Sequence, residues 1–246
     1  TLPLLFPQAT ISNNNKKIND WYYGKSDLQK NTLYIIVTKQ FYPSESQLTI
    51  LKKIVTAGNY VMIVTPIMNN EAESFFDLQQ QNGYTLTEFD KFNPKDSVHL
   101  LKPPFKSDTS FTYPGFDGSG YFFNYDKEKF LVAATNDKFK SIFLKVNDGE
   151  GSFLLHSNPF LFSNYFLLYK NNHQYLENVF ALVPPTVKNI VWDEYFMSKT
   201  NTDDEYNSQK QNSKLSVLLS NPSFAWAFYL TIALLAIYLL LHVKSF

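Results

Sequence analysis

The sequence contains no cysteine among its 246 residues. A thiolate nucleophile, a cysteine-ligated zinc or iron–sulfur site and a disulfide are therefore excluded. Net charge is absent as well, because 22 Lys and Arg residues balance 22 Asp and Glu residues. Without a basic tract the chain lacks the electrostatic footprint of a nucleic-acid-binding protein, so we expect no nucleic-acid partner.

Apolar and aromatic residues are abundant by contrast. Hydrophobic residues make up 44% of the chain and aromatic residues 17%, with 23 Phe and 16 Tyr. This content is enough to bury a sizeable core, and it predicts a folded domain rather than a disordered chain. The sequence starts at Thr1 rather than at Met, and we expect a processed or truncated N-terminus.

An apolar run, FAWAFYLTIALLAIYLLLHV, occupies residues 224–243 and carries no formal charge before His242. A helix rises about 1.5 Å per residue, so this run spans roughly 30 Å, the thickness of a bilayer's hydrocarbon core. A buried core helix of this length would carry a polar stripe, which is missing here. We predict one transmembrane helix over residues 220–246. Small residues on it would permit close packing against other membrane helices: Ala225, Ala227, Ala233 and Ala236.

The stretch before this helix is polar. Residues 198–214, SKTNTDDEYNSQKQNSK, lack hydrophobic periodicity, which is typical of a flexible tether. The predicted organisation is an α/β domain over residues 1–197, a polar tether and juxtamembrane segment over 198–219, and the membrane helix over 220–246.

Short apolar runs alternate with amphipathic stretches inside the first 197 residues. Leu33–Val37 and Tyr60–Val64 are apolar, rich in β-branched residues and bounded by turn residues, as buried parallel strands are. Between them, Pro43–Ala57 has apolar residues at helical spacing and is followed by Gly58 and Asn59. These three segments predict a β-α-β unit.

The remaining segments complete an α/β pattern. Two further helices are predicted, over Glu71–Gln81 and Tyr165–Leu182. Four further strands are predicted, over Ser97–Leu101, Ser141–Val146, Ser152–His156 and Asn189–Trp192. The aromatic, glycine-containing stretch Phe111–Asn136 predicts an inserted antiparallel hairpin, and Thr1–Pro7 the end of a helix. The predicted fold is a three-layer α/β sandwich with a β-hairpin insertion.

The first candidate site is a strand that ends at His156 and turns into a helix. Doubly wound sheets bind ligands at the carboxyl ends of their strands, so we take His156, Ser157, Asn158 and Asn164 as ligand- or partner-binding candidates. A nucleophile–base pair of Ser157 and His156 is disfavoured, because adjacent strand residues point to opposite faces and no Gly-x-Ser-x-Gly elbow is present. The alternative is a structural turn with Asn164 as helix cap.

The second candidate is the carboxylate pair Asp193 and Glu194 at the end of the last predicted strand. Paired acids serve general acid–base catalysis or bind a hard cation. Neighbouring strand side chains diverge, however, and no third ligand lies nearby in the sequence. We expect one acid to pair at the sheet edge and the other to be solvated. The four histidines show no paired metal spacing, so we predict no metal, no cofactor and no catalytic residue.

Two further features have ordinary structural interpretations beside functional ones. Asp117-Gly118-Ser119-Gly120 lacks the spacing of a phosphate-binding glycine motif and predicts a tight turn. An aromatic cluster in the same stretch is either a partner surface or strand core: Tyr113, Tyr121, Phe122 and Phe123.

Three segments carry a family resemblance. The run Gly149–Tyr165 (GEGSFLLHSNPFLFSNY) resembles the signature of an uncharacterised membrane-protein family of Bacteroidota-type bacteria, the domain of unknown function number forty-three-fifty. Asn189–Tyr195 (NIVWDEY) resembles that family's terminal strand, and Ser216–Leu241 its juxtamembrane and membrane-spanning segment. The three occur in the family's order.

The resemblance implies a flavodoxin-like, glutamine-amidotransferase-like domain outside the cytoplasm. It also implies a bacterial inner-membrane location with the domain facing the periplasm, a further helix before the domain and a basic cytoplasmic tail after the span. Members are often encoded near MoxR-type AAA+ ATPases and other membrane proteins, which are the partners it suggests. Amidotransferases use a cysteine nucleophile, and this chain has none.

These observations lead to one functional hypothesis and one alternative. We expect a non-catalytic, membrane-anchored scaffold, sensor or accessory subunit of a membrane protein complex, binding a partner or small ligand through its α/β domain. The alternative is a cryptic hydrolase or carbohydrate-active domain that uses Asp193, Glu194 or Ser157.

Overall fold

A computed structural model describes five parts of the chain: residues 2–24, 30–82, 92–116, 120–199 and 230. The chain divides into two compact units, Thr1–Thr200 and Asn201–Phe246, and the elements described below belong to the first. The predicted membrane helix with its four alanines lies outside the described residues, apart from Leu230. No helix within the described parts combines the length and apolarity needed to cross a bilayer.

The described residues contain helices on both sides of one mixed β-sheet. The helices are α1 (Leu2–Leu5), α2 (Ile18–Tyr23), α3 (Glu45–Thr56), α4 (Asn70–Phe76), the 3-10 helix η2 (Pro159–Phe162), α5 (Asn164–Leu167) and α6 (His173–Ala181). The strands are β1 (Thr10–Asn14), β2 (Thr32–Val37), β3 (Tyr60–Val64), β4 (Gln79–Gln81), β5 (Phe92–Leu100), β6 (Thr109–Phe116), β7 (Tyr121–Phe123), β8 (Leu131–Asn136), β9 (Ser141–Asp148), β10 (Gly151–His156) and β11 (Asn189–Asp193).

The sheet has a parallel half and an antiparallel half. Its main order is β1-β11-β2-β3-β10-β9-β8-β5-β6, and β7 joins β4 to β9 at the side. The five strands from β1 to β10 are parallel, and the strands that follow β10 in the order pair antiparallel. The predicted β-α-β unit is confirmed, because β2 and β3 pair in parallel and α3 connects them. The fold is therefore a mixed α/β domain.

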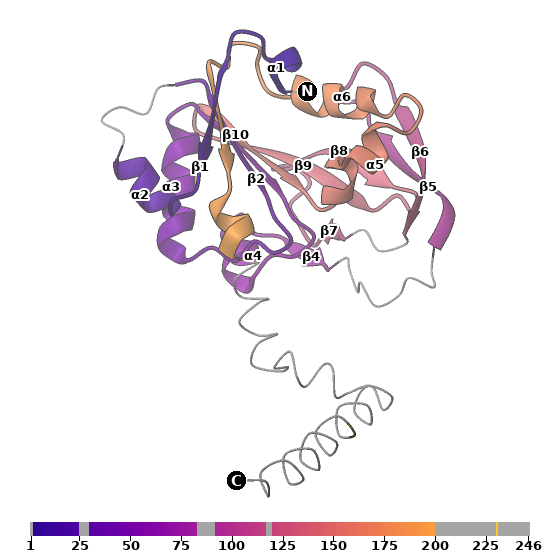
Figure 1. The fold of residues 1–246 in the computed structure, drawn as a ribbon, viewed down its shortest axis with the longest axis horizontal. Coiled ribbons are helices and arrows are strands. Elements are labelled where there is room, and N and C mark those ends of the chain that lie inside the picture. Colours follow the sequence, from indigo (N-terminus) through magenta and orange to yellow (C-terminus); the bar gives the residue numbers. More distant parts are fainter. Residues whose placement is uncertain (1, 25–29, 83–91, 117–119, 200–229, 231–246) are drawn as a thin grey trace, which may run out of the picture. The chain divides into compact units, whose positions relative to one another are not determined.

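Both faces of the parallel half are covered. Along β2, Leu33 and Ile35 belong to one apolar cluster and Tyr34 and Ile36 to the other, because successive strand side chains point to opposite faces. The first cluster includes buried residues of α6, and the second includes the apolar face of α3. Figure 1 shows α1 and α6 on one side of these strands and α2 and α3 on the other. Burial on both faces explains why β2 and β3 are continuously apolar.

The predicted hairpin over Phe111–Asn136 is wrong in its pairing. Strand β6 forms a hairpin with β5, and β8 lies between β5 and β9. The segment thus extends the main sheet instead of forming a separate insertion. Sequence patterning could not assign these partners, because pairing between strands distant in the chain depends on which edge is free.

Two predicted helices are shorter than their patterns indicated. The helix expected over Glu71–Gln81 ends at Phe76, where Asp77 takes a left-handed conformation with φ of 55° and the chain continues into β4. The helix expected over Tyr165–Leu182 is two helices, α5 and α6, separated by a turn in which Lys170 has φ of 51°. A single left-handed residue other than glycine can end a helix, and the sequence then contains no glycine that would mark the helix end.

The glycines of the family signature serve packing. Gly149 has φ of 62° in the two-residue turn between β9 and β10, a conformation that favours glycine. A Cβ at Gly151 would lie 2.0 Å from the carbonyl oxygen of Asn59 and 2.4 Å from that of Val55. Because glycine has no Cβ, the β9–β10 turn can lie directly against the end of α3. Lys30 and Glu150 add an exposed ion pair of 2.7 Å beside it.

Candidate functional site

The two candidate groups end different strands of the parallel half. His156 ends β10 and Asp193 ends β11, and both β2 and β3 lie between these strands. Three inter-strand steps of about 4.8 Å separate them by roughly 14 Å. Both candidates therefore lie at the carboxyl ends of parallel strands, but too far apart to form one site.

Asp193 is a buried carboxylate that three donors surround. Its Oδ2 accepts from the Tyr34 hydroxyl and, at 3.3 Å, from Asn14 Nδ2, while its Oδ1 accepts from the Phe196 N–H at 2.9 Å. Burial raises the pKa of Asp193, and the hydrogen bonds counter that rise only in part. Burial, followed by the nearby carboxylate, raises the pKa of Tyr34. The cluster ties β1, β2 and β11 to the helical residues 195–199 that follow β11.

Glu194 points away from this cluster. Its exposed Oε1 accepts from Asn13 Nδ2 at 2.7 Å. Asp193 is buried in a hydrogen-bonded cluster and Glu194 is half-buried outside it, as expected for neighbouring residues whose side chains diverge. The two carboxylates do not converge on a common point. Among the described residues, no group of three His, Asp or Glu side chains is arranged to hold a metal ion.

His156 is a buried, neutral imidazole. Its Nδ1 accepts from the Asn158 N–H at 3.0 Å, so Nε2 carries the proton and donates to the Tyr175 hydroxyl oxygen at 2.7 Å. Burial lowers the pKa of His156 to about 3 and raises that of Tyr175. The imidazole connects the end of β10 to α6.

Ser157 bonds to main-chain groups instead of to His156. Its Oγ contacts two carbonyl oxygens, that of Gly120 at 2.6 Å and that of Ile142 at 3.3 Å. The side chain is fully buried. A hydroxyl held in this way has no base beside it and no route to a substrate, which disfavours the nucleophile interpretation.

The two asparagine candidates have unequal roles. Asn158 Oδ1 accepts from the Phe160 N–H at 3.1 Å and caps η2. Asn164, expected to cap the following helix, is instead its first residue and is exposed. Ser163 is the cap, with its Oγ accepting from the Phe166 N–H at 3.4 Å. The prediction missed the cap by one residue, because Ser and Asn both suit that position.

The aromatic cluster expected in the same region divides between core and surface. Tyr113 and Phe122 are buried, Tyr121 is half-buried, and Phe123 is exposed. The core interpretation therefore holds for Tyr113 and Phe122, and Phe123 lies at the surface. Of the predicted glycine turn, residues 117–119 lie outside the described part of the chain.

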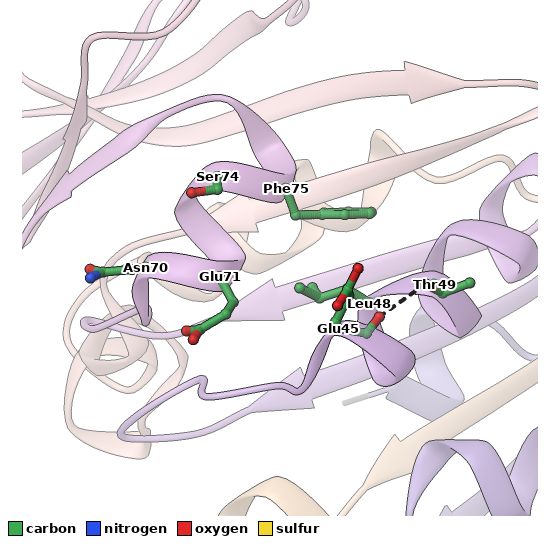
Figure 2. A pocket seen from close by; sticks show the side chains of 7 residues that line it. All are labelled: Glu45, Leu48, Thr49, Asn70, Glu71, Ser74 and Phe75. Atoms are coloured by element: carbon green, nitrogen blue, oxygen red, sulfur yellow. Dashed lines mark hydrogen bonds between the residues drawn. The ribbon is translucent and has the colours of Figure 1, made fainter.

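An open groove of about 510 Å³ lies between α3 and α4. It is lined by Glu45, Leu48, Thr49, Asn70, Glu71, Ser74 and Phe75. Figure 2 shows the ring of Phe75 extending from α4 toward α3, with Glu71 below α4 and with Asn70 and Ser74 on the side of α4 away from α3. The volume lies within the usual range for small-ligand pockets.

Sequence reasoning missed this groove. The chain's own signal was weak: Glu71 and Phe75 lie four residues apart on one side of a helix whose other side is buried, which ordinary amphipathicity explains equally well. The groove forms because α4 packs near α3, and the distance between these two helices is a property of the packed fold.

Residues 11–180 match the family described as Domain of unknown function (DUF4350). The match covers more than half of the chain and contains the signature Gly149–Tyr165, whereas the segments Asn189–Tyr195 and Ser216–Leu241 lie beyond it. No curated protein matches the sequence.

Several solved structures share part of the fold. The mmIFT52 N-terminal domain is 16% identical, with a TM-score of 0.47, over 61% of this chain and 76% of that chain. The exo-beta-1,4-mannosidase Op5Man5 from Opitutaceae bacterium strain TAV5 is 8% identical, with a TM-score of 0.38, over 63% of this chain and 25% of that chain. A beta-galactosidase from Bacillus circulans sp. alkalophilus is 11% identical, with a TM-score of 0.40, over 63% of this chain and 23% of that chain. The chain thus spans about a quarter of each glycosidase, and nothing about function follows from likenesses this partial.

Proposed function

The chain belongs to this family of domains of unknown function, and we propose that it is a membrane-anchored binding module. It would act as a non-catalytic scaffold, sensor or accessory subunit of a membrane protein complex. The observation that carries the proposal is the α3–α4 groove, which is open, while the polar groups at the carboxyl edge of the sheet are bonded to one another.

The polar groups at the carboxyl ends of the parallel strands do not support a hydrolytic role. A hydrolase that used Ser157 or Asp193 would need those groups exposed to substrate, yet both are buried and hydrogen-bonded to the protein itself. Glu194 is half-buried and bonded to Asn13, and Asp193 is not directed toward the same point. Two carboxylates at a defined separation are what glycoside hydrolysis ordinarily requires.

The membrane part of the proposal rests on the sequence. The apolar run over residues 224–243 has the length of a spanning helix and would hold the domain at a bacterial inner membrane, facing the periplasm. A flavodoxin-like, glutamine-amidotransferase-like architecture fits the parallel half of the sheet with helices on both faces. The partners we propose are other membrane proteins, including those that operate with a MoxR-type AAA+ ATPase.

Co-purification from membranes tests the binding role. We would tag the native chain, isolate it in mild detergent, and identify accompanying proteins by mass spectrometry. The variant Thr49→Arg, at an exposed position lining the groove, should lose the stoichiometric partner. Leu168→Arg, at an 81% exposed position outside the groove, is the matched control and should retain it.

Two results would contradict the proposal. One is that the chain purifies from the membrane without a stoichiometric partner, or that the partner still co-purifies with the Thr49→Arg variant. The other is hydrolysis of esters, amides or glycosides by the purified chain at ordinary enzymatic rates, lost on Glu194→Gln, which would establish the enzymatic alternative.

A further inference from the structure

The α3–α4 groove combines an apolar floor with an acidic rim. Leu48 is only 2% exposed and lies in the floor, and the half-buried ring of Phe75 extends beside it (Figure 2). Two exposed glutamates line the groove from different helices, Glu45 from α3 and Glu71 from α4. Apolar surface and negative charge are thus presented to the same space.

The two carboxylates are not used by the contacts around them. Ser44 and Asn69 already cap α3 and α4, accepting from the N–H groups of Gln47 and Ala72. An acid in the first turn adds a favourable interaction with the helix dipole, but that interaction directs no side chain toward a neighbouring helix. Within the described part of the chain, neither Glu45 nor Glu71 has an ion-pair partner.

The charge along α4 is also negative, whereas α3 carries Lys52 and Lys53 about two turns beyond Glu45. Helix α4 carries Glu71 and Glu73, is followed by Asp77, and contains no Lys or Arg. Glu73 and Asp77 line a second hollow of about 430 Å³ on another side of α4. Acidic side chains are therefore concentrated on more than one side of α4, although the whole chain is neutral.

We propose that the occupant of the groove is a basic segment of a partner protein. A lysine or arginine side chain of that segment lies against the ring of Phe75, with its charge near Glu45 and Glu71 and its aliphatic stem over Leu48. Aromatic faces attract cations within about 6 Å, and long basic side chains cover apolar surface while keeping the charge in water. The inference rests on the proposed binding function and names the chemistry of its partner.

Other occupants fit less well. An acidic segment would meet two like charges, and a purely apolar segment would leave both carboxylates beside an uncharged surface. A basic segment would cover the apolar floor with its aliphatic stems and neutralise the acidic rim with its charge. The groove is also open, which suits a stretch of polypeptide lying across it rather than an enclosed small molecule.

Peptide binding to the full chain in neutral detergent tests this occupant. The probe is a labelled heptapeptide with two lysines and two leucines, and its partner is the same peptide with norleucine in place of lysine. Fluorescence anisotropy should show the lysine peptide binding at least about tenfold more tightly, with affinity falling as salt rises. The double variant Glu45→Gln/Glu71→Gln should weaken the lysine peptide about tenfold. The control Glu128→Gln/Glu177→Gln, at exposed positions outside the groove, should leave it unchanged.

Three outcomes overturn the basic occupant. They are no binding of the lysine peptide up to about millimolar concentration, equal binding of both peptides, and equal affinity of the lysine peptide for the unchanged chain and the double variant. The co-purification experiment separates this from failure of the binding role itself. If Thr49→Arg abolishes co-purification while peptide charge has no effect, the groove binds a partner and only its basic character is wrong.

Discussion

Asp193 and His156 make the stability of the protein depend on pH in opposite directions, although burial is the main cause of both pKa shifts. A buried carboxyl is easier to protonate than a free one, and a buried imidazole is harder to protonate. Burial raises the pKa of Asp193 and lowers that of His156 to about 3. Their pH effects on folding therefore have opposite signs and must be separated by substitution.

Asp193→Asn should change how the free energy of unfolding depends on pH. Because the folded pKa of Asp193 is raised, its stabilising contribution is fully present below the ordinary carboxyl pKa of about 4 and is lost as pH rises through the folded value. The stability difference between the unchanged chain and the variant should thus be largest near pH 4 and should shrink toward pH 7. Urea unfolding at a series of pH values measures it.

His156 does not confuse that comparison, because both proteins contain it and its contribution cancels in the difference. Glu194→Gln is the control, since that half-buried carboxylate lies outside the buried cluster, and its difference from the unchanged chain should not follow this trend. Parallel pH curves for the unchanged chain and Asp193→Asn would contradict the assignment.

Gly151→Ala should destabilise the domain by about 3 kcal/mol, the upper part of the range for overpacking. The added Cβ would lie 2.0 Å from the Asn59 carbonyl oxygen, and backbone atoms on both sides leave it no flexible neighbour to displace. Thermal or urea unfolding measures the loss. Glu150→Ala removes only an exposed ion pair at the adjacent position and should change stability by less than about 0.5 kcal/mol. Similar losses in both variants would refute the packing explanation.

Helix α5 shows how a one-residue shift in a cap changes the effect of a mutation. Ser163 and Asn164 are both good capping residues, and only the backbone decides which of them caps the helix. Ser163 has extended dihedral angles and accepts from the Phe166 N–H, whereas Asn164 has entered the helix.

Ser163→Ala should therefore cost about 1 kcal/mol of stability, and Asn164→Ala should cost little, because its side chain is exposed and caps nothing. Chemical denaturation of the two variants side by side gives the comparison. The reverse order of the two losses would show that the helix begins one residue later.

The molecule as a whole joins a parallel half-sheet to an antiparallel extension. Strand β10 is the junction, since it pairs in parallel with β3 and antiparallel with β9. The short β9–β10 turn makes this change of direction possible. Gly149 and Gly151 allow that turn to lie close against α3, because neither has a side chain. Apolar clusters on both faces contain residues of both halves, so they pack as one domain.

The proposed membrane anchor predicts how the full chain fractionates. If residues 224–243 span a bilayer, the chain should stay in the membrane pellet after alkaline carbonate extraction and be released only by detergent. Leu234→Arg/Leu235→Arg places two charges near the middle of the run and should shift the chain toward the soluble fraction. Carbonate release of the unchanged chain would contradict the anchor.

Features that depend on local periodicity and on residue chemistry could be predicted from the order of the amino acids alone. The apolar runs of β2 and β3, the amphipathic α3 between them and the divergence of Asp193 from Glu194 all follow from neighbours along the chain. The absence of cysteine excluded thiol chemistry before any fold was known. A helix period or a strand period needs only a few consecutive residues, so these features were predictable.

The contacts between distant segments, in contrast, depend on the packed fold. The fold paired β8 with β5, placed β2 and β3 between the two candidate sites, and enclosed Ser157 by the Gly120 and Ile142 carbonyls. It also created the α3–α4 groove from Leu48 and Phe75, which lie on separate helices. Such contacts depend on the packing of whole elements, and no pattern of adjacent residues encodes the distance between two helices.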